Sequence, residues 1–296
     1  MNFILIGSVE SSNIFLIKCI EKGFIPAHVF GLDEQYSENV SGFFPIYNTA
    51  ENNGIPATRF KKINDETSKI KEIKPDYIFV IGLSQIVNRE LIVCAKDCAI
   101  GMHPTPLPKF RGRAAIPWQI ILGVKESAVS LFKITEGMDD GDILWQEPYY
   151  IDPDDYAFDV HQKVYEALGK AIGNLLNGLS KGTIKAVQQD HSQATYLLIR
   201  REEDGQVDWK QPIEKIYSLI RGASQPYPGA FSYYEGKKVI FNRAEIIENS
   251  PYIGINGQIA KIDNGTIYIV VNDKLLKITD YTAEGKIRFV VGKKFR

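Results

Sequence analysis

Short apolar runs alternate with longer helical stripes in the first part of the chain. Residues 2–6 form one such run, as in a buried parallel strand. Ser11 and Ser12 then offer an N-cap to an apolar stripe that stops at Gly23. A second apolar run follows at residues 28–31. The pattern predicts a β-α-β unit, whose right-handed crossover produces parallel strands.

The same alternation continues along the chain, interrupted by a polar and aromatic segment from Asp33 to Pro45 that we expect to be a loop. Further elements are expected as strands near Ile55 and at 77–81, 99–103, 127–134 and 143–151, and as helices at 63–73, 87–95 and 156–179. This order predicts an α/β fold, with a Rossmann-like, mostly parallel sheet and helices on both faces. Ligands of such sheets bind beyond the carboxyl ends of the strands.

The pattern changes near residue 190 to short strands separated by turn signals. These signals are Glu235-Gly236, Asn256-Gly257, Asn264-Gly265 and Asn272-Asp273. They are typical of a small antiparallel domain or partial barrel. We therefore predict a catalytic domain at residues 1–192 and a smaller, mainly-β, OB-like domain at residues 193–296, which begins with a linker and a short helix.

The composition of the chain argues against several classes of protein. The 296 residues are 44% hydrophobic and carry a formal net charge of −1, so there is no electrostatic case for a nucleic-acid partner. Cys19, Cys94 and Cys98 fit neither a disulfide framework nor a zinc site. No run approaches the ~20 apolar residues of a membrane span, and no signal peptide is evident. We expect a cytoplasmic protein that uses no metal and contacts no membrane.

The first candidate for chemistry follows the predicted strand at 99–103 and reads HPTPLPKFRGR from His103 to Arg113. Its prolines restrict the backbone, and an imidazole at a strand end suits proton transfer. Lys109, Arg111 and Arg113 are expected to pair with an anion such as a phosphate. A single histidine is more often structural than functional, so these residues alone leave both interpretations open.

The second candidate reads EGMDDGD and spans residues 136–142. Its glycines permit close approach of the backbone to a ligand. A carboxylate here would orient and charge-stabilise His103, as the acid of a catalytic triad does. An acidic turn without function and a magnesium site are the alternatives.

Together and in this order, the two stretches resemble the N10-formyltetrahydrofolate-dependent formyltransferases, which include methionyl-tRNA formyltransferase and the sugar-nucleotide N-formyltransferases. The family pattern is Asn-x-His-x-Ser-Leu-Leu-Pro, then Arg-Gly, then Asp-x-Gly-Asp. The second half of the chain adds EDGQVDW at 203–209 and PYPGAF at 226–231, which look like the family's linker and the start of its second domain. The resemblance covers nearly the whole chain.

The resemblance implies that His103 and Asp139 are catalytic and that N10-formyltetrahydrofolate is the formyl donor. It also implies a pterin pocket, whose expected contacts are Gly82, Leu83, Ser84, Gln85, Ile86, Gly137, Met138 and Asp142. The expected contacts of the acceptor are Lys109, Arg111, Arg113, Ser11 and Trp118. Core packing is the alternative for Trp118, and a helix N-cap is the alternative for Ser84. Relatives of the sugar type are often dimers, so a homodimer is expected.

One position departs from the family pattern. The family's Asn, two places before the His, is Gly101 here, and no Asn lies between Asn88 and Asn174. In the family that Asn helps to position the formyl oxygen and the attacking amine. A backbone N–H, another side chain or a water would have to replace it, or the activity would be altered.

The acceptor is expected to be the amino group of a nucleotide-linked sugar, such as a 4-amino-4,6-dideoxy sugar on UDP, dTDP or GDP. This expectation rests on the slightly acidic balance of the chain and on the stretch PYPGAFSY at 226–233, which looks like the aminoarabinose formyltransferase. Three alternatives stay open: a methionyl-tRNA formyltransferase, a non-catalytic folate- or nucleotide-binding relative, and a dinucleotide-dependent oxidoreductase. The last lacks the Gly-x-Gly-x-x-Gly fingerprint after the first strand.

Overall fold

The computed structural model describes residues 1–38 and 40–296, and its contacts divide the chain into two units. The N-terminal unit consists of Met1–Ala115, Glu126–Tyr150 and Gln162–Leu198; the C-terminal unit consists of Ile116–Lys125, Ile151–His161 and Ile199–Arg296. Each unit has a sheet and a hydrophobic core of its own. Two short segments of the predicted catalytic domain thus group with the C-terminal unit, and the domain boundary at 192/193 stays a prediction.

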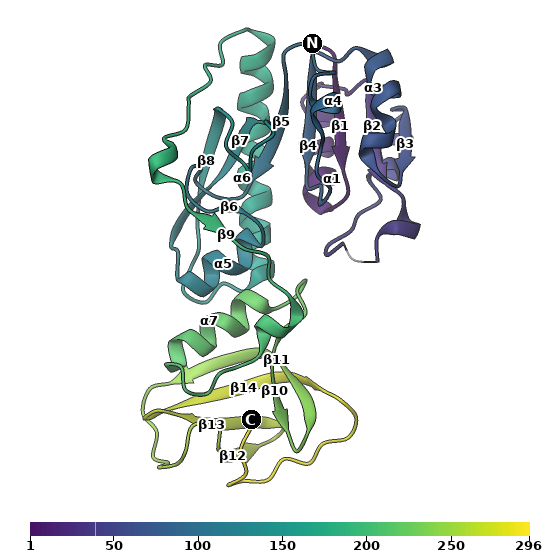
Figure 1. Cartoon of the computed structure of the whole chain (residues 1–296). Helices are drawn as coiled ribbons and strands as arrows, with labels where there is room; N and C mark the ends of the chain where they lie inside the picture. The colour runs from purple at the N-terminus through teal and green to yellow at the C-terminus, as the bar shows by residue number, and fades with distance from the viewer. Residues whose placement is uncertain (39) are drawn as a thin grey trace. The chain divides into compact units, whose positions relative to one another are not determined.

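The N-terminal unit is built on a seven-stranded sheet in the order β3-β2-β1-β4-β5-β7-β8 (Figure 1). Its strands are β1 (Phe3–Gly7), β2 (His28–Leu32), β3 (Ala57–Phe60), β4 (Tyr77–Ile81), β5 (Cys98–His103), β7 (Glu126–Lys133) and β8 (Ile143–Tyr150). The first five strands in spatial order pair in parallel, and β7 and β8 pair antiparallel. The predicted mostly parallel, Rossmann-like sheet is confirmed.

Helices cover both faces of this sheet. Phe15 of α1 packs on Phe79 of β4, with ring centroids 4.9 Å apart. Ile70 of α3 joins a core cluster with Ile78, the neighbour of Phe79 on the same strand. Successive strand residues point to opposite faces, so α1 and α3 lie on different faces. The helices of this unit are α1 (Glu10–Glu21), α2 (Ile46–Asn52), α3 (Thr67–Ile73), α4 (Arg89–Ile92) and most of α6 (Ala157–Ser180).

The helix bounds differ from the prediction in several places. The predicted helix at 63–73 begins as a 3-10 turn, η2 (Ile63–Glu66), before α3, and the one at 87–95 is only the short α4. Neither α2 nor α5 (Ala115–Leu122) was expected. The sequence of α5, AIPWQIIL, is apolar almost throughout. It therefore lacks the alternation of apolar and polar positions that reveals an amphipathic helix.

The C-terminal unit contains a five-stranded antiparallel sheet in the order β10-β11-β14-β13-β12. Its main elements are α7 (Ile213–Ala223), β10 (Ala230–Tyr234), β11 (Lys237–Ile247), β12 (Ile259–Asp263), β13 (Thr266–Val271) and β14 (Lys274–Ala283). Glu235, Asn264 and Asn272 have positive φ angles in the three connecting hairpins and bends, as two-residue turns require. The predicted smaller, mainly-β domain is confirmed. No helix in the described ranges has the length and apolarity to cross a membrane.

Candidate functional site

The carboxyl ends of β1, β4 and β5 meet at one edge of the parallel sheet, because β4 pairs with both other strands. Gly82 leaves β4 with a φ of +60°. A Cβ at this position would lie 2.4 Å from Cγ2 of Val9 and 2.5 Å from Oγ of Ser11. Only a glycine fits both the conformation and the space. It brings the loop at 82–86 directly beside Ser11 in the first turn of α1.

His103 is the last residue of β5, and its side chain is buried. Its Nε2 lies 2.7 Å from the carbonyl oxygen of Phe110. A carbonyl only accepts hydrogen bonds, so Nε2 carries the proton and donates it. In the neutral imidazole the other nitrogen, Nδ1, is then a bare acceptor. The fold therefore leaves Nδ1 as the nitrogen that can take up a proton.

Asp139 faces this nitrogen from the loop between β7 and β8. Its Oδ2 lies 3.8 Å from Nδ1 of His103 and accepts a hydrogen bond from the backbone N–H of Gly112 at 2.8 Å. A distance of 3.8 Å is too long for a direct hydrogen bond. The structure thus brings together the two residues that the sequence pairs as catalytic.

The loop at 82–86 is fixed by its own polar groups. The amide of Gln85 accepts from the backbone N–H of Ile63 at 2.9 Å and donates to the carbonyl of Lys61 at 2.8 Å. The Ser84 carbonyl accepts a 3.4 Å hydrogen bond from the guanidinium of Arg113. The side chain of Gln85 therefore holds this loop to the end of β3, whereas the side chains of Ser84 and Ile86 are exposed.

In the loop at 136–142, Glu136 forms an exposed 3.7 Å ion pair with Arg89 of α4. Asp142 forms a 3.1 Å ion pair with Lys133, which ties the loop to β7. The side chain of Asp140 packs on Gly137 and fills the space that a Cβ at position 137 would need. Met138 is more than half exposed and lies close to Gly112. An apolar, exposed side chain thus sits next to the His103–Asp139 pair.

The three basic residues of the 103–113 stretch have different surroundings. Lys109 is exposed, and Arg113 is exposed apart from its hydrogen bond to the 82–86 loop. Arg111, in contrast, is only 1% exposed. Its guanidinium donates to Oε1 of Gln189 at 2.7 and 3.2 Å. This placement assigns Arg111 to the interior framework and leaves Lys109 and Arg113 as the expected contacts of an anion.

Trp118, the remaining expected contact of the acceptor, belongs to α5 in the C-terminal unit. The guanidinium of Arg200 stacks on its indole ring at 4.8 Å from the ring centroid. Burial lowers the pKa of Arg200, and the nearby Asp204 counteracts this effect. One face of the indole is therefore covered by a cation of its own unit.

The space that the family's Asn would need is filled in this chain. Gly101 pairs with Phe132 on β7, and a Cβ at Gly101 would lie 3.0 Å from the Phe132 ring and 3.2 Å from the side chain of Ile134. Positions 101 and 103 are two residues apart in β5, so they face the same side of the sheet. Aromatic and aliphatic groups thus occupy the position from which an Asn side chain would reach toward His103.

We predict that Gly101→Asn lowers the free energy of unfolding by about 1–3 kcal/mol, because overpacking a filled core displaces its neighbours. Chemical denaturation with matched m-values measures the change. Gly123→Asn is the control: it places the same side chain in open space at a positive φ that Asn tolerates. Equal stability of Gly101→Asn and the wild type would contradict this packing explanation.

Several polar residues that the sequence did not single out hold the 103–113 loop. The hydroxyl of Ser130 is fully buried and donates to the carbonyl of Thr105 at 2.6 Å. Gln146 donates to the carbonyl of Leu107 at 2.9 Å. The hydroxyl of Thr105 donates to the carbonyl of Lys109 at 3.0 Å. Ser130 and Gln146 follow no local motif, so only their position across the antiparallel strands reveals this role.

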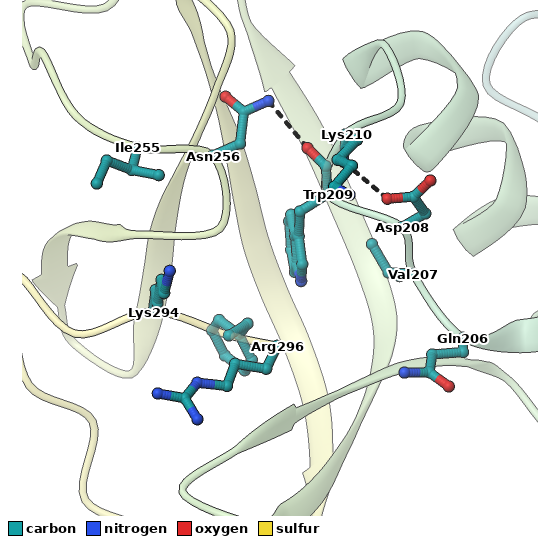
Figure 2. A pocket seen from close by; sticks show the side chains of 10 residues that line it. Gln206, Val207, Asp208, Trp209, Lys210, Ile255, Asn256, Lys294 and Arg296 are labelled. Carbon is teal, nitrogen blue, oxygen red and sulfur yellow. Dashed lines mark hydrogen bonds between the residues drawn. The ribbon is translucent and has the colours of Figure 1, made fainter.

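The C-terminal unit has a pocket of its own, of about 680 Å³, shown in Figure 2. Trp209 and Phe295 contribute apolar surface, and the lining includes the cations Lys210, Lys294 and Arg296 with the single carboxylate of Asp208. The C-terminal pocket is therefore cationic at its rim. Over residues 1–38 and 40–296, no three His, Cys, Asp or Glu side chains are grouped to hold a metal ion.

Two family models match the chain, one after the other. The family model described as "Formyl transferase" matches residues 38–176, and "Formyl transferase, C-terminal domain" matches residues 200–291. The methionyl-tRNA formyltransferase of Caldanaerobacter subterraneus is 30% identical over 254 residues, which are 84% of this chain and 82% of that protein.

Solved structures share the fold at lower identity. HypX from Aquifex aeolicus in complex with tetrahydrofolic acid superposes with a TM-score of 0.70 at 20% identity, over 95% of this chain and 44% of that one. An N-formyltransferase from Helicobacter canadensis in complex with folinic acid and dTDP-3-aminofucose superposes with a TM-score of 0.68 at 17% identity, over 94% of this chain and 98% of that one. Both family models, matched in order on the two units, show that this chain belongs to the formyltransferase family.

Proposed function

We propose that the protein transfers the formyl group of N10-formyltetrahydrofolate to the amino group of a nucleotide-linked amino sugar, with His103 and Asp139 as catalytic residues. The observation that carries this proposal is the pairing of Nδ1 of His103 with Oδ2 of Asp139 at 3.8 Å, at a strand end of a formyltransferase. The family membership supports the formyl transfer, and the acceptor is inferred from the charges of this chain.

In this proposal His103 acts as a proton shuttle. Its Nε2–H is held by the Phe110 carbonyl, so a neutral ring has no second donor to offer an oxyanion. Nδ1 instead takes the proton that the acceptor nitrogen loses on attack and returns it to the departing nitrogen of the donor. Asp139 stabilises the imidazolium that exists between the two steps. The rest of the rate enhancement comes from the proximity of the two bound substrates.

The bound folate would supply an electrophilic formyl carbon beside this pair. The surroundings fit a reduced pterin with an apolar face: Ile86 is 80% exposed and Met138 is 56% exposed. Gly82 allows its loop to approach Val9 and Ser11 closely at the mouth of the site. These residues are the proposed donor pocket, together with Leu83, Ser84, Gln85, Gly137 and Asp142.

A nucleotide-linked sugar fits the charge distribution. It brings two phosphates, which Lys109 and Arg113 would neutralise. In the C-terminal unit several lysines form ion pairs with carboxylates: Lys238 pairs with Glu202, Lys274 with Glu214 and Lys277 with Glu245. Such pairing reduces the electropositive surface that a long nucleic-acid stem needs.

Methionyl-tRNA is the second candidate acceptor, and two observations favour it. The curated relative at 30% identity is a methionyl-tRNA formyltransferase. The C-terminal pocket carries Lys210, Lys294 and Arg296 at its rim, where phosphates of a nucleic acid would be neutralised.

The test is an acceptor panel with N10-formyltetrahydrofolate as donor. We expect formylation of at least one amino sugar linked to UDP, dTDP or GDP, detected by mass spectrometry of the product. Initiator methionyl-tRNA is assayed in parallel at 50 and 200 mM salt. Efficient, steeply salt-dependent formylation of the tRNA, reduced by the double substitution K294Q/R296Q and without any sugar product, would replace the sugar proposal by the tRNA one.

A further inference from the structure

We propose that Gln189 is a positioning residue of the transfer reaction and acts through Asp139. The inference rests on the proposed function, because it assumes that the carboxylate of Asp139 works in catalysis. Gln189 is 3% exposed and lies outside both catalytic stretches, in the segment after α6.

All hydrogen-bonding positions of the Gln189 amide are used. Its Nε2 donates to the carbonyl of Asp139 at 2.8 Å and to the carbonyl of Gly141 at 2.7 Å. Its Oε1 accepts two hydrogen bonds from Arg111, at 2.7 and 3.2 Å. A reversed amide would set an oxygen against two carbonyl oxygens and an NH₂ against a guanidinium. The orientation of this buried amide is therefore fixed.

The backbone that Gln189 holds is strained. Asp139 has a φ of +50°, a left-handed conformation that residues with a side chain rarely adopt and that persists where the surroundings hold it. The two hydrogen bonds from Nε2 fix the orientation of the peptide groups that follow Asp139 and Gly141. They thereby keep Oδ2 of Asp139 at the N–H of Gly112 and 3.8 Å from His103.

The same segment also holds the histidine side of the pair. The hydroxyl of Thr195 accepts a hydrogen bond from the N–H of Phe110 at 2.8 Å, and its carbonyl accepts from the N–H of Arg111 at 2.9 Å. Phe110 is the residue whose carbonyl binds Nε2 of His103. Residues 189–195 thus fix the position of both catalytic side chains, and the buried Arg111 is the anchor of Gln189 within this framework.

The variant that separates positioning from general stability is Gln189→Glu. A carboxylate keeps the acceptor for Arg111 but sets an oxygen, not an N–H donor, against the carbonyls of Asp139 and Gly141. We expect kcat to fall roughly 10- to 100-fold, as for a misplacement of about 1 Å, while KM for both substrates changes less than about threefold. In the Asp139→Asn background the same change is expected to cost less than about threefold, because the two residues act as one unit.

One further measurement and one control variant test whether Gln189 acts through Asp139. Hydrogen–deuterium exchange of the 136–142 segment should rise in Gln189→Glu, while exchange of β2 stays unchanged; this readout needs no acceptor and so separates a failure of this inference from a failure of the proposed function. Gln258→Met is the matched control, since Gln258 also bridges two backbone groups, Ile255 N–H and the Gly292 carbonyl, in the C-terminal unit. Unchanged exchange at 136–142, or equal losses of kcat in both backgrounds, would overturn the proposal.

Discussion

His103→Ala is expected to retain the fold and to lower kcat/KM for formyl transfer about 10²- to 10⁴-fold, the usual contribution of general acid–base catalysis. The fold leaves Nδ1 of the imidazole as an acceptor at this strand end, because Nε2 donates to the Phe110 carbonyl. Steady-state kinetics with the acceptor identified by the panel measures the loss, and circular dichroism checks the fold. Near-normal turnover in a folded His103→Ala would remove the catalytic role of His103.

His28 offers a matched control for this substitution. It is also a buried histidine of the same sheet, and its Nε2 lies 2.7 Å from the hydroxyl of Thr58. It begins β2, so it lies at the amino ends of the parallel strands, opposite to the site. His28→Ala should cost stability but leave kcat/KM within about threefold of the wild type, because it removes the same ring from the opposite edge of the sheet.

Local patterns in the sequence were sufficient to predict the sheet, and the family resemblance supplied the pairing of His103 with Asp139. The apolar runs at β1, β4 and β5 end at a glycine or a histidine, and parallel strands bring such ends together. His103 and Asp139 each lie in a compact motif that directly follows a strand or precedes one. The two side chains lie close together because β7, which precedes the loop of Asp139, pairs with β5, which carries His103.

What the sequence did not reveal depends on packing between distant segments. Arg111 looks like an anion contact in the sequence, yet it is buried against Gln189, 78 residues further along the chain. Gln189 follows no periodic pattern and no motif. The space available for a side chain at position 101 likewise depends on Phe132 and Ile134. A polar side chain gives no local sign of its partner when the two are brought together only by tertiary structure.

Asp139→Asn is expected to lower kcat on the order of 10²- to 10³-fold, as the loss of one preorganised electrostatic group does. Asparagine tolerates the φ of +50° observed here, and its side-chain oxygen can still accept the hydrogen bond from Gly112 N–H. The substitution therefore removes the charge and keeps the geometry. The measured loss isolates what the carboxylate does for the imidazolium of His103.

The control for Asp139→Asn is Glu136→Gln, which removes a carboxylate of the same loop. Glu136 is exposed, and its ion pair with Arg89 is 3.7 Å long, so its charge is screened by solvent. We expect kcat of Glu136→Gln to stay within about twofold of the wild type. Equal losses in both variants would mean that the negative potential of the whole loop matters. A loss confined to Asp139→Asn assigns the effect to the one carboxylate that His103 faces.

The double variant of Asp139→Asn with His103→Ala is the final test. Because the carboxylate acts on the imidazolium, Asp139→Asn should lower kcat almost no further once the ring is gone.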